Sequence, residues 1–181
     1  MTNPKQNNYL VISAMGADRP GIVDEFSGQI FECGCNIEDS RMAVLGKEFA
    51  LILLVSGRWD AIAKLETALD PLAKRLDLSL NQRRTDSRAQ TADSLPYAVD
   101  VSAMDQPGIV HKLSKFLAKR GINIEDMSTA RYPAPHTGTP MFGVHMTIGI
   151  PAKTQIAALR DDFLDFCDQL NIDAVMEPLK N

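Results

Sequence analysis

An internal repeat is the feature that most constrains how this chain folds. Residues 18–23 read DRPGIV and residues 105–110 read DQPGIV, a separation of 105 minus 18, or 87 residues. The same offset carries residues 36–39 onto residues 123–126, and both stretches read NIED. A period of this length is too long for a solenoid repeat and suits one small domain. The sequence therefore predicts two tandem copies of a single fold.

The composition is that of an ordinary globular protein. Of 181 residues, 45% are hydrophobic and 23% are charged, and the net charge is −4. The acidic balance argues against direct nucleic-acid binding, because phosphate contacts need a clustered basic surface. No apolar run reaches the roughly 18–20 residues that span a bilayer, and the polar residues 1–8 lack the apolar core of a signal peptide. We expect a cytoplasmic protein with no membrane partner.

The first copy shows alternating strand and helix patterns. Pro20 fits the first turn of a helix with Arg19 as its cap, and Gly34 fits its left-handed terminator. The apolar stripe from Ile62 to Leu76 has spacings of 3 and 4, typical of an amphipathic helix on a sheet. The predicted elements are strand 9–15, helix 20–33, strand 36–45, strand 49–55, helix 59–76 and a short closing strand through Leu78 and Leu80.

The second copy repeats this order with strand 97–104, helix 107–120 and a terminating Gly121. Six extra residues enter between its second and third strands, within a proline-rich stretch, 132–140, that we expect to form an irregular loop. The order βαββαβ predicts an α+β fold of two ferredoxin-like domains with antiparallel four-stranded sheets. The predicted domains are 1–84 and 97–181, joined by a polar linker, 85–96.

The strand-to-helix turns are the candidate ligand sites. Backbone N–H groups around Gly21 and Gly108 have no partner within the helix, and the helix dipole attracts a carboxylate there. Asn36 and Asn123 open the next strand and offer both donors and an acceptor, and Asp18 and Asp105 could hold an ammonium. These residues also occur as plain capping and turn residues, and the aspartates as local turn partners, so both interpretations stand at this point.

The pattern Asp-x-Pro-Gly before a helix, followed by Asn-Ile at the next strand, resembles the ACT domain, an amino-acid-sensing regulatory module. Two such modules filling nearly the whole chain resemble the glycine cleavage system transcriptional repressor family. The resemblance implies a ligand, usually an amino acid, near the first loop and between paired modules. Carried over by position, the binding residues are Asp18, Pro20, Gly21 and Asn36 in the first copy, and Asp105, Pro107, Gly108 and Asn123 in the second.

The same resemblance implies a repressor that binds a transcription activator rather than DNA, with glycine as the effector. A detached amino-acid-sensing regulatory subunit of a biosynthetic enzyme is the alternative, and a structural module with vestigial sites is a third. The sequence has no nucleophile with a base, phosphate loop or coherent metal-ligand spacing, so we expect no enzyme activity, cofactor or metal. Three irregularly spaced cysteines predict free thiols, leaving the roles of Cys33 and Cys35 open.

The two copies differ on the sheet face that the helices leave uncovered. This outer face is more apolar in the first copy. An apolar sheet face needs a covering surface, so we expect a homo-oligomer or pairing of modules within the chain. In the second copy Asp100 and His145 share outward parity on neighbouring strands, where an ion pair, a shared polar pocket and a simple surface contact are the alternatives, the last being favoured. Methionines such as Met15, Met104, Met127 and Met146 fit core or interface filler. The aligned outer positions are Ala50, Ile52 and Leu54 in the first copy, and Gly143, His145 and Thr147 in the second.

Overall fold

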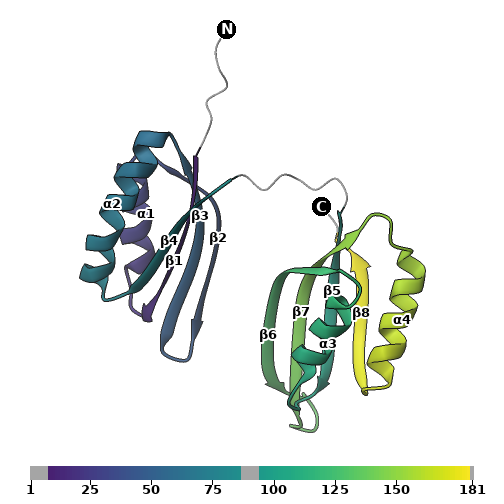
Figure 1. The fold of residues 1–181 in the computed structure, drawn as a ribbon. Helices are drawn as coiled ribbons and strands as arrows, with labels where there is room; N and C mark the ends of the chain where they lie inside the picture. Colours follow the sequence, from purple (N-terminus) through teal and green to yellow (C-terminus); the bar gives the residue numbers. More distant parts are fainter. Residues whose placement is uncertain (1–7, 87–93, 180–181) are drawn as a thin grey trace. The chain divides into compact units, whose positions relative to one another are not determined.

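The computed structural model describes residues 8–86 and 94–179. The chain divides into two compact units, residues 1–89 and 90–181. Each unit runs in the order βαββαβ, with two helices covering one face of a four-stranded sheet (Figure 1). The predicted α+β fold, two tandem ferredoxin-like domains, is confirmed. Most of the predicted linker 85–96 falls outside the described residues.

The elements of the first unit follow the predicted order closely. The amphipathic helix predicted over 59–76 has those bounds in the structure. The strand predicted over 36–45 also has those bounds, whereas the two central strands are longer than predicted because the backbone pairing continues past the apolar stretches. The elements are β1 (Asn8–Ala17), α1 (Ile22–Glu32), β2 (Asn36–Leu45), β3 (Glu48–Gly57), α2 (Trp59–Leu76) and β4 (Ser79–Thr85).

The second unit repeats this plan. Its first strand begins at Ser94, inside the stretch predicted as linker. The elements are β5 (Ser94–Met104), α3 (Ile109–Ala118), β6 (Asn123–Pro133), β7 (Pro140–Pro151), α4 (Ile156–Asp168) and β8 (Ile172–Pro178).

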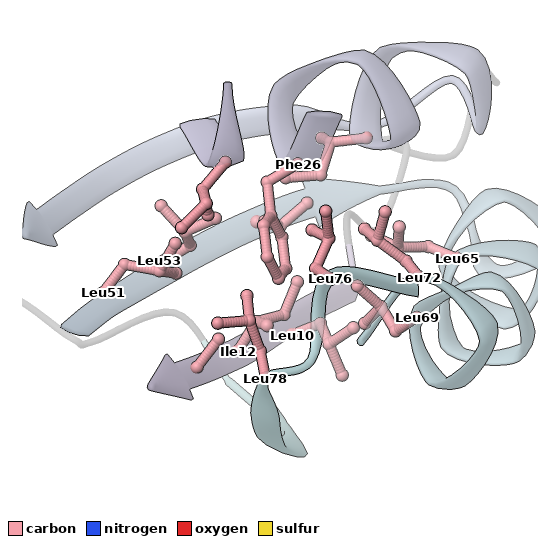
Figure 2. Close-up of a cluster of buried hydrophobic side chains, with 14 of the residues drawn as sticks. Leu10, Ile12, Phe26, Leu51, Leu53, Leu65, Leu69, Leu72, Leu76 and Leu78 are labelled. Atoms are coloured by element: carbon pink, nitrogen blue, oxygen red, sulfur yellow. The ribbon is translucent and has the colours of Figure 1, made fainter. Parts of the chain in front are cut away.

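Both sheets have the same antiparallel topology. The strand order is β2-β3-β1-β4 in the first unit and β6-β7-β5-β8 in the second. Alternate residues of each central strand point to the helices, since successive side chains in a strand face opposite sides. Leu10 and Ile12 of β1 are fully buried, and Phe26 of α1 packs with them (Figure 2). Each unit has its own hydrophobic core.

The helix starts differ from the prediction. α1 begins at Ile22 rather than Pro20, and its N-cap is Gly21, not Arg19. α3 likewise begins at Ile109, two residues later than predicted. Gly21 has φ 96° and ψ −11°, close to the third position of a type II turn, for which Pro-Gly is the usual pair. The Pro-Gly pair therefore forms a turn before the helix instead of its first turn.

The proline-rich insertion is more regular than predicted. Tyr132 and Pro133 belong to β6, and Pro133 pairs with Pro140 at the start of β7. Only residues 134–139 connect the two strands. The N–H of Ala134 donates to the Thr139 carbonyl at 2.9 Å, which closes this loop. The insertion lengthens a hairpin.

The methionines do not share one environment. Met146 is buried in the second core, as expected for core filler. Met15 and Met104 are 55% and 63% exposed, so the core part of the expectation is wrong for them. Both lie near the end of the first strand of their unit, on the face that the helices leave uncovered.

Candidate functional site

The turn between β1 and α1 presents a helix end without a side-chain cap. Residues 18–21 are exposed, and the Asp18 N–H donates to the Lys47 carbonyl at 3.0 Å, which holds the turn against the β2–β3 hairpin. No side chain in the described part of the chain caps α1. A Cβ built on Gly21 would meet no atom within 4 Å, so the space beside the helix end is open. The first-turn N–H groups can therefore donate hydrogen bonds to an outside acceptor such as a carboxylate.

The second unit has the same turn. Gly108 caps α3 with φ 91°, again without a side-chain hydrogen bond among the described residues. The Asp105 N–H donates to the Pro140 carbonyl at 3.0 Å, and the Lys112 N–H donates to the Gly108 carbonyl at 2.9 Å. Pro107 is exposed, as Pro20 is in the first unit. Beside this turn lies a hollow of about 360 Å³ lined by Met104, Asp105, Gln106, Thr139, Pro140, Leu170 and Asn171.

The aspartates of the two turns have different surroundings. The Asp105 carboxylate forms an ion pair with Arg131 of β6, with an N–O distance of 2.6 Å. The residue aligned with Arg131 in the first copy is Val44, which is apolar. Within residues 8–86 and 94–179, no side chain pairs with the Asp18 carboxylate. The Asp18 carboxylate can therefore pair with a cationic group of a ligand, whereas the Asp105 carboxylate is already paired with the Arg131 guanidinium.

The structure does not bring Asn36 to the turn of its own unit. Asn36 pairs with Ser56 at one end of β3, while Asp18 contacts Lys47, next to Glu48 at the other end. The strand has 56 minus 48, or eight, steps between these ends. At about 3.3 Å per residue they lie roughly 26 Å apart. One small ligand cannot contact both groups in a single unit.

The second unit separates its groups in the same way. Asn123 pairs with Gly149, while Asp105 bonds to Pro140 at the start of β7. The nine steps from 140 to 149 correspond to roughly 30 Å. In each unit the candidate residues therefore form two groups at opposite ends of the sheet, the turn group and the asparagine.

The asparagine end of the first unit contains a carboxylate that sequence reasoning missed. Asn36 Nδ2 donates to Glu38 Oε1 at 3.3 Å, and the hydroxyl of the buried Ser56 donates to the same oxygen. The Ser56 hydroxyl, and then Asn36, lower the pKa of the Glu38 carboxyl. In the second unit Gly149 replaces Ser56, and a Cβ there would lie 2.8 Å from Glu125 Oε1. Glu38 belongs to the repeated NIED stretch, so the repeat of this stretch could have identified Glu38 as a candidate site residue.

Polar pairs also mark the outer sheet face of the second unit. His145 Nδ1 lies 2.6 Å from Asp100 Oδ1, and both side chains are more than half exposed, so the two residues make the surface contact that the sequence favoured. The hydroxyls of Ser102 and Tyr132 lie 2.7 Å apart on the same face. In the first unit, Ile52 occupies the position of His145 and is 47% exposed.

The structure gives three further findings that bear on the expectations from sequence. Among the described residues, no three His, Cys, Asp or Glu side chains are grouped so that they could hold a metal ion. No helix in the described ranges is both long enough and apolar enough to cross a membrane. Cys33, Cys35 and Cys167 are free thiols, as predicted.

Comparison with known proteins identifies the two units. Models of the ACT domain match residues 8–82 and residues 97–163, and these stretches contain both turns. The glycine cleavage system transcriptional repressor of Escherichia coli K12 is 35% identical over 164 residues, covering 91% of this chain and 86% of the relative. This chain belongs to the glycine cleavage system transcriptional repressor family.

Solved structures agree with this family membership. A crystal structure provisionally assigned to a glycine cleavage system transcriptional repressor is 30% identical, with a TM-score of 0.70, covering 97% of this chain and 99% of that one. A protein of unknown function from Galdieria sulphuraria is also 30% identical, with a TM-score of 0.77. The match covers 97% of this chain and 100% of the Galdieria sulphuraria chain. The family member described here is thus a regulatory protein built from two ACT domains.

Proposed function

We propose that this protein is an amino-acid-responsive repressor of glycine cleavage genes. In this proposal it binds a transcription activator rather than DNA, carries out no catalytic step, and responds to glycine as its effector. The 35% identity to the glycine cleavage system transcriptional repressor of Escherichia coli K12 supports the gene system. The net charge of −4 supports a protein partner over nucleic acid, since a DNA-binding surface needs clustered cations.

The observation that carries the ligand assignment is the uncapped start of α1 beside an unpaired carboxylate. The first-turn N–H groups after Gly21 have no side-chain cap among the described residues, and the space beside Gly21 is open, which favours an anion, while Asp18 has no side-chain partner among the same residues. An α-amino acid carries one carboxylate and one ammonium on the same carbon atom, so it can satisfy both groups. The turn does not exclude larger amino acids by itself, and glycine is proposed from the relative's gene system.

The asparagines enter the site only with a second module. Because Asn36 lies roughly 26 Å from the turn of its own unit, the asparagine that contacts a ligand must come from another ACT module. A homo-oligomer can supply one, and we propose this as the ligand-binding form. Asn36 Nδ2 already contacts Glu38, so the pair would offer the ligand an amide oxygen and a carboxylate.

Calorimetric titration with each of the twenty amino acids, followed by a thermal-shift series, tests the ligand assignment. A ligand at about 100 times its dissociation constant adds about 2.7 kcal/mol to stability. Glycine binding that is lost in Asp18→Asn supports the proposal. Absence of binding by every amino acid contradicts it.

The partner is tested separately, by affinity capture from extract with and without the bound amino acid. Recovery of a transcription activator that is released by glycine supports repression. Recovery of a biosynthetic enzyme instead supports the alternative, a detached regulatory subunit.

A further inference from the structure

A charged groove lies between α3 and α4 of the second unit, on a part of the molecule that the proposed ligand site does not use. Its volume is about 560 Å³, the largest of the cavities described here. One wall comes from α3 and its C-terminal end, the other from α4. The lining residues that carry charge are Lys112, Lys115, Lys119, Arg120, Asp162 and Asp165.

The α3 wall is a row of cations. Lys112, Lys115 and Lys119 follow one another at spacings of 3 and 4, so they share one face of the helix. All three are exposed. A basic row of this length contrasts with the net charge of −4 of the whole chain.

The fold itself does not require these cations. With the offset of 87, the first copy has Glu25, Gly28 and Glu32 at the positions of the three lysines. The same helix therefore carries acidic residues in one unit and a basic row in the other. A purely structural role would not demand this reversal, so the row points to a partner of opposite charge.

The floor of the groove is aromatic. The rings of Phe116 and Phe166 stack with centroids 4.8 Å apart, and Phe116 also meets Phe163 edge-on at 5.4 Å. The Arg120 guanidinium lies 3.7 Å from the Phe116 centroid and bonds to Asp162 at 3.1 Å. Gln29 replaces Phe116 in the first copy. Phe116 is buried and lies under Arg120, so an apolar side chain that inserts between the helices would contact the half-buried Phe166.

The acidic residues of the opposite wall favour a protein partner over nucleic acid. Asp162 and Asp165 of α4 are exposed along the groove and would repel a phosphate backbone. An amphipathic helix can place acidic side chains toward α3 and other residues toward α4. From Lys112 to Lys119 the row extends about 10.5 Å, or two helical turns, which matches a short helix laid in a groove.

We propose that the α3–α4 groove of the second unit docks an acidic helical segment of the partner protein, with an apolar side chain on the phenylalanine floor. The inference rests on the proposed function in one respect, namely that the chain acts through a protein partner. The groove starts one turn after Gly108, because Lys112 donates its N–H to the Gly108 carbonyl, whereas the proposed ligand turn lies in the first unit.

A designed peptide is the probe for this proposal: a helical 16-residue peptide with glutamates on one face and a central leucine. Fluorescence anisotropy with the full chain should show binding that weakens as salt rises. Lys115→Glu combined with Lys119→Glu should weaken it about 10-fold or more. Lys74→Glu combined with Lys153→Glu is the matched control, with the same charge change at exposed positions that do not line the groove, and should change it less than about twofold.

A charge-swapped peptide makes the test independent of folding. The same peptide with lysine in place of glutamate should bind the Lys115→Glu, Lys119→Glu variant better than it binds the unmodified chain. Equal effects of the groove pair and the control pair would overturn the proposal. The proposal would also be overturned if duplex DNA or inorganic phosphate bound the groove in preference to the acidic peptide. Self-association of the chain through the groove, without peptide binding there, would overturn it as well.

The same samples distinguish this proposal from the proposed function. Glycine binding is measured by calorimetry on the groove variant, whose ligand turn is unchanged. If glycine binds and the peptide does not, the groove proposal fails alone. If the peptide binds by charge at the groove and no amino acid binds, the effector assignment fails and the groove stands.

Discussion

The Arg131 guanidinium lies 2.6 Å from the Asp105 carboxylate, whereas the aligned Asp18 has Val44 at the corresponding strand position. One substitution thus separates two turns that are otherwise alike in backbone. Among the described residues, the Asp18 carboxylate at the start of α1 has no side-chain partner, whereas the Asp105 carboxylate at the start of α3 is neutralised by Arg131.

We therefore predict that only the first turn recognises an ammonium. Asp18→Asn should weaken glycine binding about 10-fold, while Asp105→Asn should change it less than about twofold, since Arg131 already pairs with Asp105. Calorimetry with glycolate, which lacks the ammonium, is the control. Glycolate should bind weakly and should not distinguish the Asp18→Asn variant from the parent. Similar losses in both aspartate variants would contradict this assignment.

Glycine-to-alanine substitutions in and near α1 should have opposite signs. Gly21 has φ 96°, so Gly21→Ala should lower the free energy of unfolding of the first unit by about 1–2 kcal/mol through backbone strain. Gly28 lies inside the helix with no atom within 4 Å of a built Cβ, so Gly28→Ala should raise it by about 0.5–1 kcal/mol. Urea unfolding followed by Trp59, the sole tryptophan, reports on this unit. Equal signs would refute the strain argument.

The Glu66–Arg84 ion pair should stabilise the first unit only above acid pH. Two guanidinium hydrogen bonds, at 2.8 and 2.7 Å, lower the pKa of the Glu66 carboxyl. Because the folded pKa lies below the unfolded one, the contribution is present above the ordinary glutamate value and is lost as pH falls through the folded value. Glu66→Gln should cost roughly 0.5 kcal/mol at pH 7. At pH 2.5 melting curves of parent and variant should converge, and a persisting gap would point to lost packing instead.

Cys167 should be unreactive in the folded chain. Burial raises the pKa of its thiol to about 12, and burial also raises the pKa of Cys35. Ellman's reagent at pH 8 should label Cys167 slowest, and all three cysteines should react once urea unfolds the chain.

The same pKa shift has a consequence for stability. A raised folded pKa favours the folded state below the ordinary thiol value, so this contribution should decline as pH rises toward about 12. Cys167→Ala should flatten this alkaline decline, although the cavity lowers stability at every pH. An unchanged slope would assign the alkaline loss to other groups.

Much of the fold could be predicted because the chain repeats local rules. The stripe from Ile62 to Leu76 sets the bounds of α2, and the left-handed Gly34 and Gly121 follow α1 and α3 as expected. The start of α1 was misassigned because proline is common both in a first helical turn and in a type II turn. The glycine after Pro20 favours the turn, since only it accepts a positive φ readily.

The candidate site was predictable in part. Asn36 follows α1, so an 11-residue helix already separates it from the turn by about 16 Å, and the strand register shows them at opposite ends. The pairing of Arg131 with Asp105 could not be predicted in the same way. It depends on the register of β6 and on a side-chain conformation, neither of which leaves a local pattern in the sequence.

The bare entrance of α1 also has a dynamic consequence. A helix that lacks a side-chain cap frays at its first turn, so the amide protons just after Gly21 should exchange with solvent faster than those farther along the helix. A bound carboxylate would take the place of the missing cap and slow that exchange. Protection of the first-turn amides of α1 against hydrogen exchange would then rise with effector occupancy and would report ligand binding at individual residues.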